Sequence, residues 1–375
     1  MERTLNTANI KAAMDKAGLT QTRLAAKINV SREIVSKWLA GSKFPRPDKL
    51  LKLGLALDLV FADLVTHPIN EHEPVIAFRK RGNARTTGVH IKKAREMGHM
   101  LAPLVAYLPF DKLLQPPALK NPRNEYAYIQ EVANKVRMEI GLGIDKVLDF
   151  SHLIKRFNDL QAVIVPVMWG KKERHENALH IYLPQSMTTW IYLNLDTEVH
   201  DFKFWMAHEL GHVYARELRN EEAEDFADDF AGALLYPANL AEQTYNELIV
   251  TDDKAKQVEI IRSRADCYSI SMISVFYEAN KFATANNKEE IELGDYIYKA
   301  NTNFYKQYET VREALFPDTS PDAAEYIKKS EEIFDTPFFS ALRSYLAENG
   351  KSAGYIQCIL DTPLLDSKEL HAELS

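Results

Sequence analysis

A chain of 375 residues with 46% hydrophobic and 26% charged residues has the composition of a water-soluble protein of two or three domains. The sequence shows no signal peptide and no apolar stretch of the ~18 residues that a membrane span needs, so we expect a cytoplasmic protein. Its two cysteines, Cys267 and Cys358, form no C-x-x-C pair. This excludes a disulfide framework and a thiolate zinc finger, so that any metal would bind to histidine and carboxylate.

The formal net charge of -7 is unevenly distributed along the chain. Residues 1–65 contain 11 Lys and Arg against 6 Asp and Glu, an excess of +5, which leaves -12 for the remaining residues. A basic N-terminal piece on an acidic protein is typical of a DNA-binding domain. We therefore treat residues 1–65 as a separate domain.

The N-terminal domain has the spacing of a helix-turn-helix. Apolar periodicity predicts helices over 6–17, 21–28 and 32–41, and a fourth helix after a basic turn in 41–59. Two short helices joined by a turn of three or four residues are what this motif requires. The third predicted helix is therefore the candidate for insertion into the major groove.

Polar side chains are placed to contact DNA from this motif. Arg32, Ser36 and Lys37 lie opposite the apolar stripe of the third helix, where they can reach base edges or phosphates. Gln21 begins the second helix and can bond a phosphate, and Lys43 adds a charge in the basic turn. Double-stranded operator DNA is the expected partner, and the alternative is a helical domain that binds protein.

The stretch TQTRLAAKINVSREIVSKWLAGSKFPRPDKLLKLGLALDL resembles the XRE class of helix-turn-helix domains found in phage repressors and Cro. Thr20 and Ser31 stand at the expected helix caps. Asn29 replaces the usual glycine of the turn, and asparagine tolerates a left-handed backbone. The resemblance covers about 60 residues and implies sequence-specific DNA binding.

Residues 66–124 are expected to be a linker and a basic helical segment. The first part, 66–76, is polar and interrupted twice by proline. The segment 79–95 carries seven basic residues and no acid. It either extends the DNA footprint through phosphate contacts or forms a solvated helix face beside a turn.

A mainly helical α+β fold is expected beyond this segment. Residues 125–140 and 151–161 have helical spacing, whereas 162–169, 175–183 and 189–195 are β-rich runs separated by polar turns. The pattern predicts a small three-stranded sheet. A zincin-like metallopeptidase domain over 125–285 and a helical C-terminal region over 286–375 follow from the motifs below.

The sequence HELGH supplies two candidate metal ligands. His208 and His212 are four residues apart, so on a helix both can direct a ring nitrogen at one ion. Glu209 is offset by one step and can reach a water at that ion without being a ligand. H-E-x-x-H therefore indicates zinc hydrolysis, with Glu209 as the catalytic residue.

A second helix offers the third ligand that catalytic zinc requires. The apolar residues of 226–234 form a stripe, which leaves Glu221, Glu224 and Asp228 on the opposite side. Glu224 is the preferred ligand because Asp228 lies one turn further on, where it can hold the other nitrogen of a ligating histidine. Glu221 is the alternative ligand.

The composition of the HELGH helix predicts which way its histidines face. Met206, Leu210 and Val213 form its core stripe, so both histidines should face the second helix. Gly211 costs a helix interior ~1 kcal/mol relative to alanine. We interpret it as the point where another backbone passes close by.

The segments AHELGHVYA and EDFADDFAGALLYP resemble the ImmA/IrrE family of zinc metallopeptidases, over roughly 125–285. Membership implies Zn²⁺ at His208, His212 and Glu224, with Glu209 as general base. It also implies action on a protein, commonly a repressor whose cleavage releases genes during stress or phage induction.

Two features of the resemblance stay open. Tyr236 stands where the family usually has methionine, which we expect to change packing more than chemistry. No residue is assigned as the group that stabilises the oxyanion, for which Tyr214, His180 and His200 are the candidates.

The sequence favours a DNA-binding transcriptional regulator with zinc-dependent endopeptidase activity. The alternative is an XRE-type repressor or antitoxin-like regulator whose peptidase-like domain senses or scaffolds without cleaving. The intact metal and base residues favour the enzyme, because a retired site is free to lose its base. Expected partners are operator DNA and a protein substrate, with a homodimer left open and no membrane; 286–375 has no assigned role.

Overall fold

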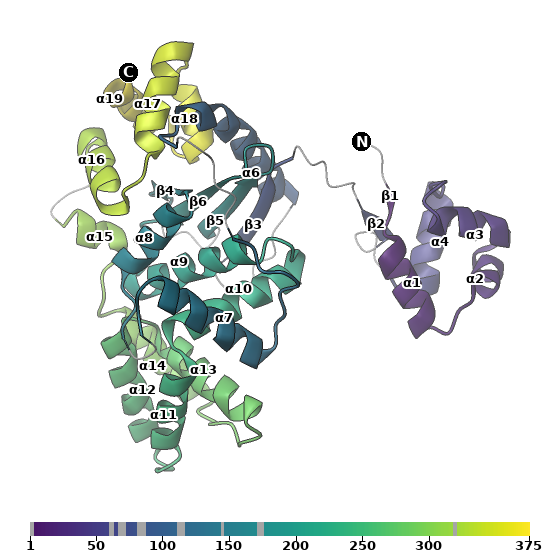
Figure 1. The fold of residues 1–375 in the computed structure, drawn as a ribbon, viewed down its shortest axis with the longest axis horizontal. Coiled ribbons are helices and arrows are strands. Elements are labelled where there is room, and N and C mark those ends of the chain that lie inside the picture. Colours follow the sequence, from purple (N-terminus) through teal and green to yellow (C-terminus); the bar gives the residue numbers. More distant parts are fainter. Residues whose placement is uncertain are drawn as a thin grey trace. The chain divides into compact units, whose positions relative to one another are not determined.

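The structure is a computed structural model that describes residues 4–59, 64–66, 73–80, 88–110, 117–143, 146–170, 176–317 and 321–375. It contains two compact units, Met1–Glu73 and Pro74–Ser375, each built around its own hydrophobic core (Figure 1). Within the described ranges, no helix combines the length and apolar character that crossing a bilayer would require.

Four short helices pack together in the described residues of the first unit. They are α1 (Thr7–Lys16), α2 (Gln21–Ile28), α3 (Arg32–Leu39) and α4 (Pro47–Leu57). A two-residue antiparallel pairing of β1 (Thr4–Leu5) with β2 (Val65–Thr66) joins the two ends of this bundle. The helices predicted for this region are all present.

Local chemistry sets the turn between α2 and α3. The Thr20 hydroxyl accepts a hydrogen bond from a backbone N–H in the first turn of α2, and Ser31 does the same for α3. Asn29 ends α2 in the left-handed conformation, at φ 57°. Val35 and Trp38 are buried against the other helices, which leaves the opposite face of α3 exposed.

The second unit contains a mixed sheet of four strands, in the order β3-β5-β6-β4. The strands are β3 (Val75–Lys80), β4 (Ala162–Val167), β5 (Glu176–Leu183) and β6 (Thr188–Asn194). Only β4 and β6 run parallel. The prediction of three strands was wrong because β3, an edge strand followed by basic residues, lies inside the segment interpreted as linker.

Helices cover both faces of the sheet. The histidine of β5, His180, faces α9 (Val199–Tyr214), whereas Trp190 of β6 packs on Phe338 of α17 (Phe338–Asn349). In Figure 1, α9 and α10 (Asn220–Leu235) lie below the sheet, and α17, α18 (Ala353–Leu360) and α19 (Leu364–Leu374) lie above it. The mainly helical α+β class is therefore confirmed.

The remaining helices complete the second unit. They are α6 (Gly88–Leu101), η1 (Ala102–Tyr107), α7 (Tyr126–Glu139), α8 (Phe150–Asp159), α11 (Ala238–Leu248), α12 (Lys254–Tyr268), α13 (Met272–Ala285), α14 (Asp295–Tyr305), α15 (Val311–Leu315), α16 (Ala323–Phe334), α18 (Ala353–Leu360) and α19 (Leu364–Leu374). Their buried residues form one core with the sheet. The finer bounds 66–124, 125–285 and 286–375 stay predictions.

A close helix contact at the candidate site lies between α9 and α10. A Cβ atom on Gly211 would stand 2.9 Å from the Cα of Ala227 and 3.3 Å from the ring of Phe230. The backbone of α10 thus passes where the sequence led us to expect a neighbour. Only glycine allows the two helices to lie this close.

Substituting Gly211 by Ala is expected to lower the free energy of unfolding of the second unit by up to about 2 kcal/mol, because an overpacking cost of about 1–3 kcal/mol outweighs the ~1 kcal/mol that alanine gains over glycine in a helix interior. Chemical denaturation measures this loss. Gly143→Ala is the matched control, since a Cβ there meets nothing within 4 Å, and its effect should stay within about 0.5 kcal/mol. A Gly211→Ala protein as stable as wild type would contradict the packing argument.

Candidate functional site

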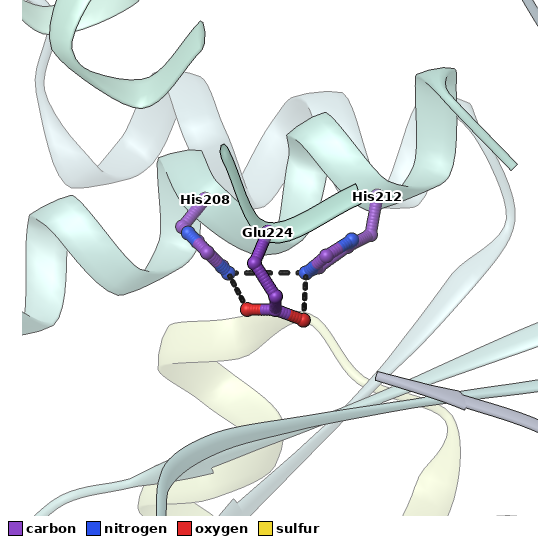
Figure 2. A group of neighbouring side chains, drawn as sticks. All are labelled: His208, His212 and Glu224. Atoms are coloured by element: carbon purple, nitrogen blue, oxygen red, sulfur yellow. Dashed lines mark hydrogen bonds and ion pairs between the residues drawn. The ribbon is translucent and has the colours of Figure 1, made fainter. Parts of the chain in front are cut away.

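Side chains of α9 and α10 meet between the two helices and form a candidate metal centre (Figure 2). The Nε2 atoms of His208 and His212 are 3.0 Å apart. The Oε2 atom of Glu224 lies 3.5 Å from Nε2 of His208, and its Oε1 atom lies 3.5 Å from Nε2 of His212. The three residues therefore direct their polar atoms at a common point, as Figure 2 shows.

The spacing of these atoms fits a tetrahedral ion. An ion ~2.1 Å from each of three ligand atoms in tetrahedral geometry holds those atoms ~3.4 Å apart. The two nitrogens are 3.0 Å apart, each lies 3.5 Å from its nearer carboxylate oxygen, and one ligand atom from each of the three residues can be chosen so that all lie within 4.8 Å of one another. Two imidazoles and a carboxylate also form a ligand set that zinc accepts in hydrolases. The residues present thus fit the metal that the sequence predicts.

Asp228 holds the ring of His208 from behind. Its Oδ1 lies 2.9 Å from Nδ1 of His208, so the imidazole can donate that proton and keep Nε2 as a lone-pair donor. Burial by itself lowers the pKa of His208, but hydrogen bonds to Asp228 and Glu224 outweigh it and raise the pKa to about 9. The two acids therefore favour the protonated, positively charged form of the His208 ring until a metal takes the place of the proton on Nε2.

Glu209 is buried beside the metal centre with no hydrogen bond among the described residues. Its exposed fraction is 0%, and both carboxylate oxygens lack a hydrogen-bond partner there. Burial raises its pKa to about 8, although the charge of His208 opposes the shift. A carboxyl group in this setting can take up a proton near neutral pH.

His180 is the only one of the three oxyanion candidates that the described structure brings to this site. It lies on β5, with Nδ1 at 3.8 Å from an oxygen of Glu209 and its ring 5.8 Å from that of His212. Burial, followed by the charge of Arg216, lowers its pKa to about 3, so the ring is neutral. Strand alternation could have placed His180 on the face of the sheet that α9 covers.

The other two candidates lie elsewhere. The hydroxyl of Tyr214 accepts a hydrogen bond of 2.7 Å from Nε of Arg156. His200 packs its ring against that of Tyr308, at a centroid distance of 4.1 Å. Both side chains therefore serve contacts between helices, and the residue that stabilises the oxyanion stays unassigned.

Two further sequence expectations concern α10. Glu221, the alternative ligand, is exposed and lies outside the group formed by the two histidines and Glu224. Tyr236 is fully buried, and its hydroxyl lies 2.5 Å from that of Thr244. Tyr236, in place of the methionine usual in the resembled family, thus adds a buried polar contact just beyond the end of α10.

The first unit presents the side chains predicted to contact DNA. Arg32, Ser36 and Lys37 are exposed on α3. Lys43 is exposed in the turn before α4, and Gln21 is half-buried at the start of α2. The structure leaves these positions accessible, and their DNA contacts stay a prediction.

The basic segment 79–95 belongs to the second unit where it is described. On α6, Lys92 lies 3.8 Å from Glu96, and the ammonium group of Lys93 pairs with Asp361 of the C-terminal region. Residues 81–87 lie outside the described residues. These ion pairs fit a solvated helix face, and the choice between the two interpretations stays a prediction.

Comparison with known proteins supports the N-terminal assignment. Residues 10–61 match the helix-turn-helix family. No curated protein matches the chain. A structural similarity is found to the crystal structure of PlcR from Bacillus thuringiensis in complex with the peptide PapR7 and DNA, with 15% identity over 92% of this chain and 99% of that one. Its TM-score of 0.22 is too low to support an argument about fold or function.

Replacing Asp228 by Asn is expected to weaken zinc binding ~10–100-fold, because the amide no longer orients and charges the His208 ring. Competition with a chromophoric chelator measures the affinity. Asp225→Asn, an exposed position on the same helix, is the control and should bind zinc like the wild type. Equal affinities for the two variants would remove Asp228 from the site.

Replacing Arg32 or Lys37 by Ala is expected to weaken binding to an operator selected from random duplexes. Each lost phosphate contact should reduce the slope of log affinity against log salt by ~0.9, and each lost base contact should cost ~1–3 kcal/mol at one position of the operator. Lys11→Ala on α1 is the control of equal charge. Unchanged affinity in both α3 variants would exclude this helix from the interface.

Proposed function

We propose that this helix-turn-helix DNA-binding regulator is also a zinc-dependent endopeptidase. One observation carries the proposal: His208, His212 and Glu224 converge on a point beside the buried carboxyl group of Glu209, which has no hydrogen bond among the described residues. The support is geometric, since the family match covers residues 10–61 alone.

Each residue has a role that follows from its position. His208, His212 and Glu224 hold the metal, and Asp228 orients the first of these ligands. Zinc, when bound, supplies a Lewis acid that polarises a peptide carbonyl and lowers the pKa of water. Glu209 takes the proton from the attacking water and returns it to the leaving nitrogen.

The DNA-binding unit indicates the kind of substrate. A peptidase carried on a helix-turn-helix chain acts where regulators are bound, so its substrate is a repressor or partner protein in a stress, phage or mobile-element response. Chromosomal DNA as a partner places this activity in the cytoplasm. Which of these responses the protein controls depends on the operator that it binds and on the protein that it cleaves.

A second function is favoured by the burial of the same site. His208 and Glu209 both have an exposed fraction of 0%, and Trp205 packs its ring against His208 at 5.6 Å. A peptide chain must reach these atoms before it is cut, so the described conformation is closed. A regulator that binds zinc and senses or scaffolds without cleaving is consistent with such a site.

Glu209→Gln is expected to keep the metal and abolish cleavage, because the amide cannot accept the proton of water. His208→Ala is expected to lose the metal as well. The measurements are zinc per chain by metal analysis and cleavage of any repressor or toxin that a neighbouring gene encodes. Glu217→Gln, at an exposed position after α9, is the matched control.

The outcomes separate the two functions. Zinc near one per chain together with cleavage by wild type and the control variant supports the endopeptidase. Undiminished cleavage by Glu209→Gln would contradict the assignment of Glu209 as the general base. Bound zinc and operator binding without cleavage under any condition favours the sensor.

A further inference from the structure

A pocket of about 700 Å³ lies in the second unit, apart from the metal centre. Its walls are α7, α10, α13 and the segment that leads into α14. The metal-site residues His208, His212, Glu224 and Asp228 do not line it. A volume of this size is typical of pockets for small molecules.

The wall of this pocket holds a buried carboxylate, one oxygen of which has no hydrogen-bond partner among the described residues. Glu278 is 2% exposed, and its Oε1 accepts a hydrogen bond of 2.7 Å from Lys281. Lys281 also pairs with Asp229 at 2.7 Å, so its charge is shared between two acids. The Oε2 atom of Glu278 has no hydrogen-bond partner among the described residues. A buried charged oxygen without a donor is costly, which marks it as a place for a ligand donor.

The backbone of α10 makes room for this carboxylate. A Cβ atom on Gly232 would stand 2.1 Å from Oε1 of Glu278. Any side chain at 232 would therefore displace the carboxylate from its place. Gly232 on α10 leaves the space for Glu278, and Lys281 on α13 pairs with its carboxylate.

The charge of the lining is negative. Glu290 and Glu292 line the pocket together with Asp229 and Glu278, against the single ammonium group of Lys281. Burial raises the pKa of Glu278, and the charge of Lys281 opposes that shift. A cation placed against this lining gains from the excess of carboxylates.

Aromatic side chains provide the rest of the surface. Tyr277 and Tyr298 line the pocket with their hydroxyls 3.2 Å apart, and both side chains are partly exposed. Phe276 and Tyr126 lie further along the lining, and the hydroxyl of Tyr126 has no hydrogen-bond partner among the described residues. Aromatic faces combined with acids form the type of surface that binds organic cations.

We propose that this pocket binds an organic cation with N–H donors, an alkylammonium or guanidinium group on an apolar body. The cationic head donates to the carboxylate of Glu278, and the body lies against the tyrosines and Phe276. The same chemistry is offered by a free amine and by a lysine or arginine side chain of a peptide. The test below separates these two sources.

The pocket is connected to the metal centre through α10. Asp229 holds Lys281 in the pocket, and its neighbour Asp228 holds His208 in the metal centre. A ligand that shifts the Asp229–Lys281 contact is expected to shift the Asp228–His208 contact as well. Bound zinc then changes the affinity for the ligand by the same factor as the bound ligand changes the affinity for zinc. This linkage rests on the proposed zinc site, whereas the binding of a cation does not.

The test is isothermal titration calorimetry on the metal-free full-length protein. The probes are phenethylammonium and agmatine as free cations, 2-phenylethanol as the neutral analogue, and an acetylated, amidated Gly-Arg-Gly peptide. Glu278→Gln removes the charge, Tyr298→Ala removes part of the aromatic rim, and Glu289→Gln is the control on the exposed loop beside the pocket. Circular dichroism verifies that each variant is folded.

We expect a free cation to bind, with affinity at least about tenfold weaker in Glu278→Gln and unchanged in Glu289→Gln. Tighter binding of the peptide than of both free cations identifies a peptide source, and the reverse identifies a free amine. Binding of 2-phenylethanol as tight as that of phenethylammonium, or no binding of any cation to wild type, overturns the proposal. Should Glu278→Gln fail to fold, the neutral analogue and Tyr298→Ala decide the same point.

Repeating the titration with zinc present measures the linkage. A change in cation affinity on adding zinc supports coupling through α10. Cation binding in a protein that takes up no zinc would leave the pocket standing and overturn the metal centre. Zinc uptake without cation binding would support the metal centre and overturn the proposed cation pocket.

Discussion

The close approach of α9 and α10 is the contact on which the metal centre depends. Two histidines on one helix need a third ligand from elsewhere, and the carboxylate of Glu224 reaches them because the helices are separated by no side chain at Gly211. The same proximity allows Asp228 to bond the back of His208. A wider spacing between the helices would leave two histidines without a third ligand from α10.

Burial sets the electrostatics of both sites in the second unit. His208, Glu209 and Glu278 are nearly or wholly excluded from solvent, where a charge is stabilised by partners and not by water. His208 has two acids beside it, and Glu278 has Lys281, but each site also contains carboxylate oxygens with no hydrogen bond among the described residues. Such oxygens are expected where a metal, a substrate or a ligand completes the contacts.

Much of the fold was accessible from local patterns. Apolar periodicity and caps such as Thr20 and Ser31 predicted the helices of the first unit, because these signals are contained within a few residues. The edge strand β3 was missed, since its hydrogen bonds go to a strand about a hundred residues away. For the same reason, the sequence had no means of choosing His180 over Tyr214 and His200 as the residue beside Glu209.

The sequence by itself determined the chemistry that each helix carries: the two histidines and the base on one face of α9, the acids on one face of α10, and the basic surface of α3. These shared faces follow from the helical repeat of 3.6 residues per turn, which depends on the local sequence alone. The tertiary structure alone decided which faces meet, which acid becomes buried and where a pocket forms around Glu278. Those outcomes depend on distances between segments far apart in the chain, and packing sets such distances.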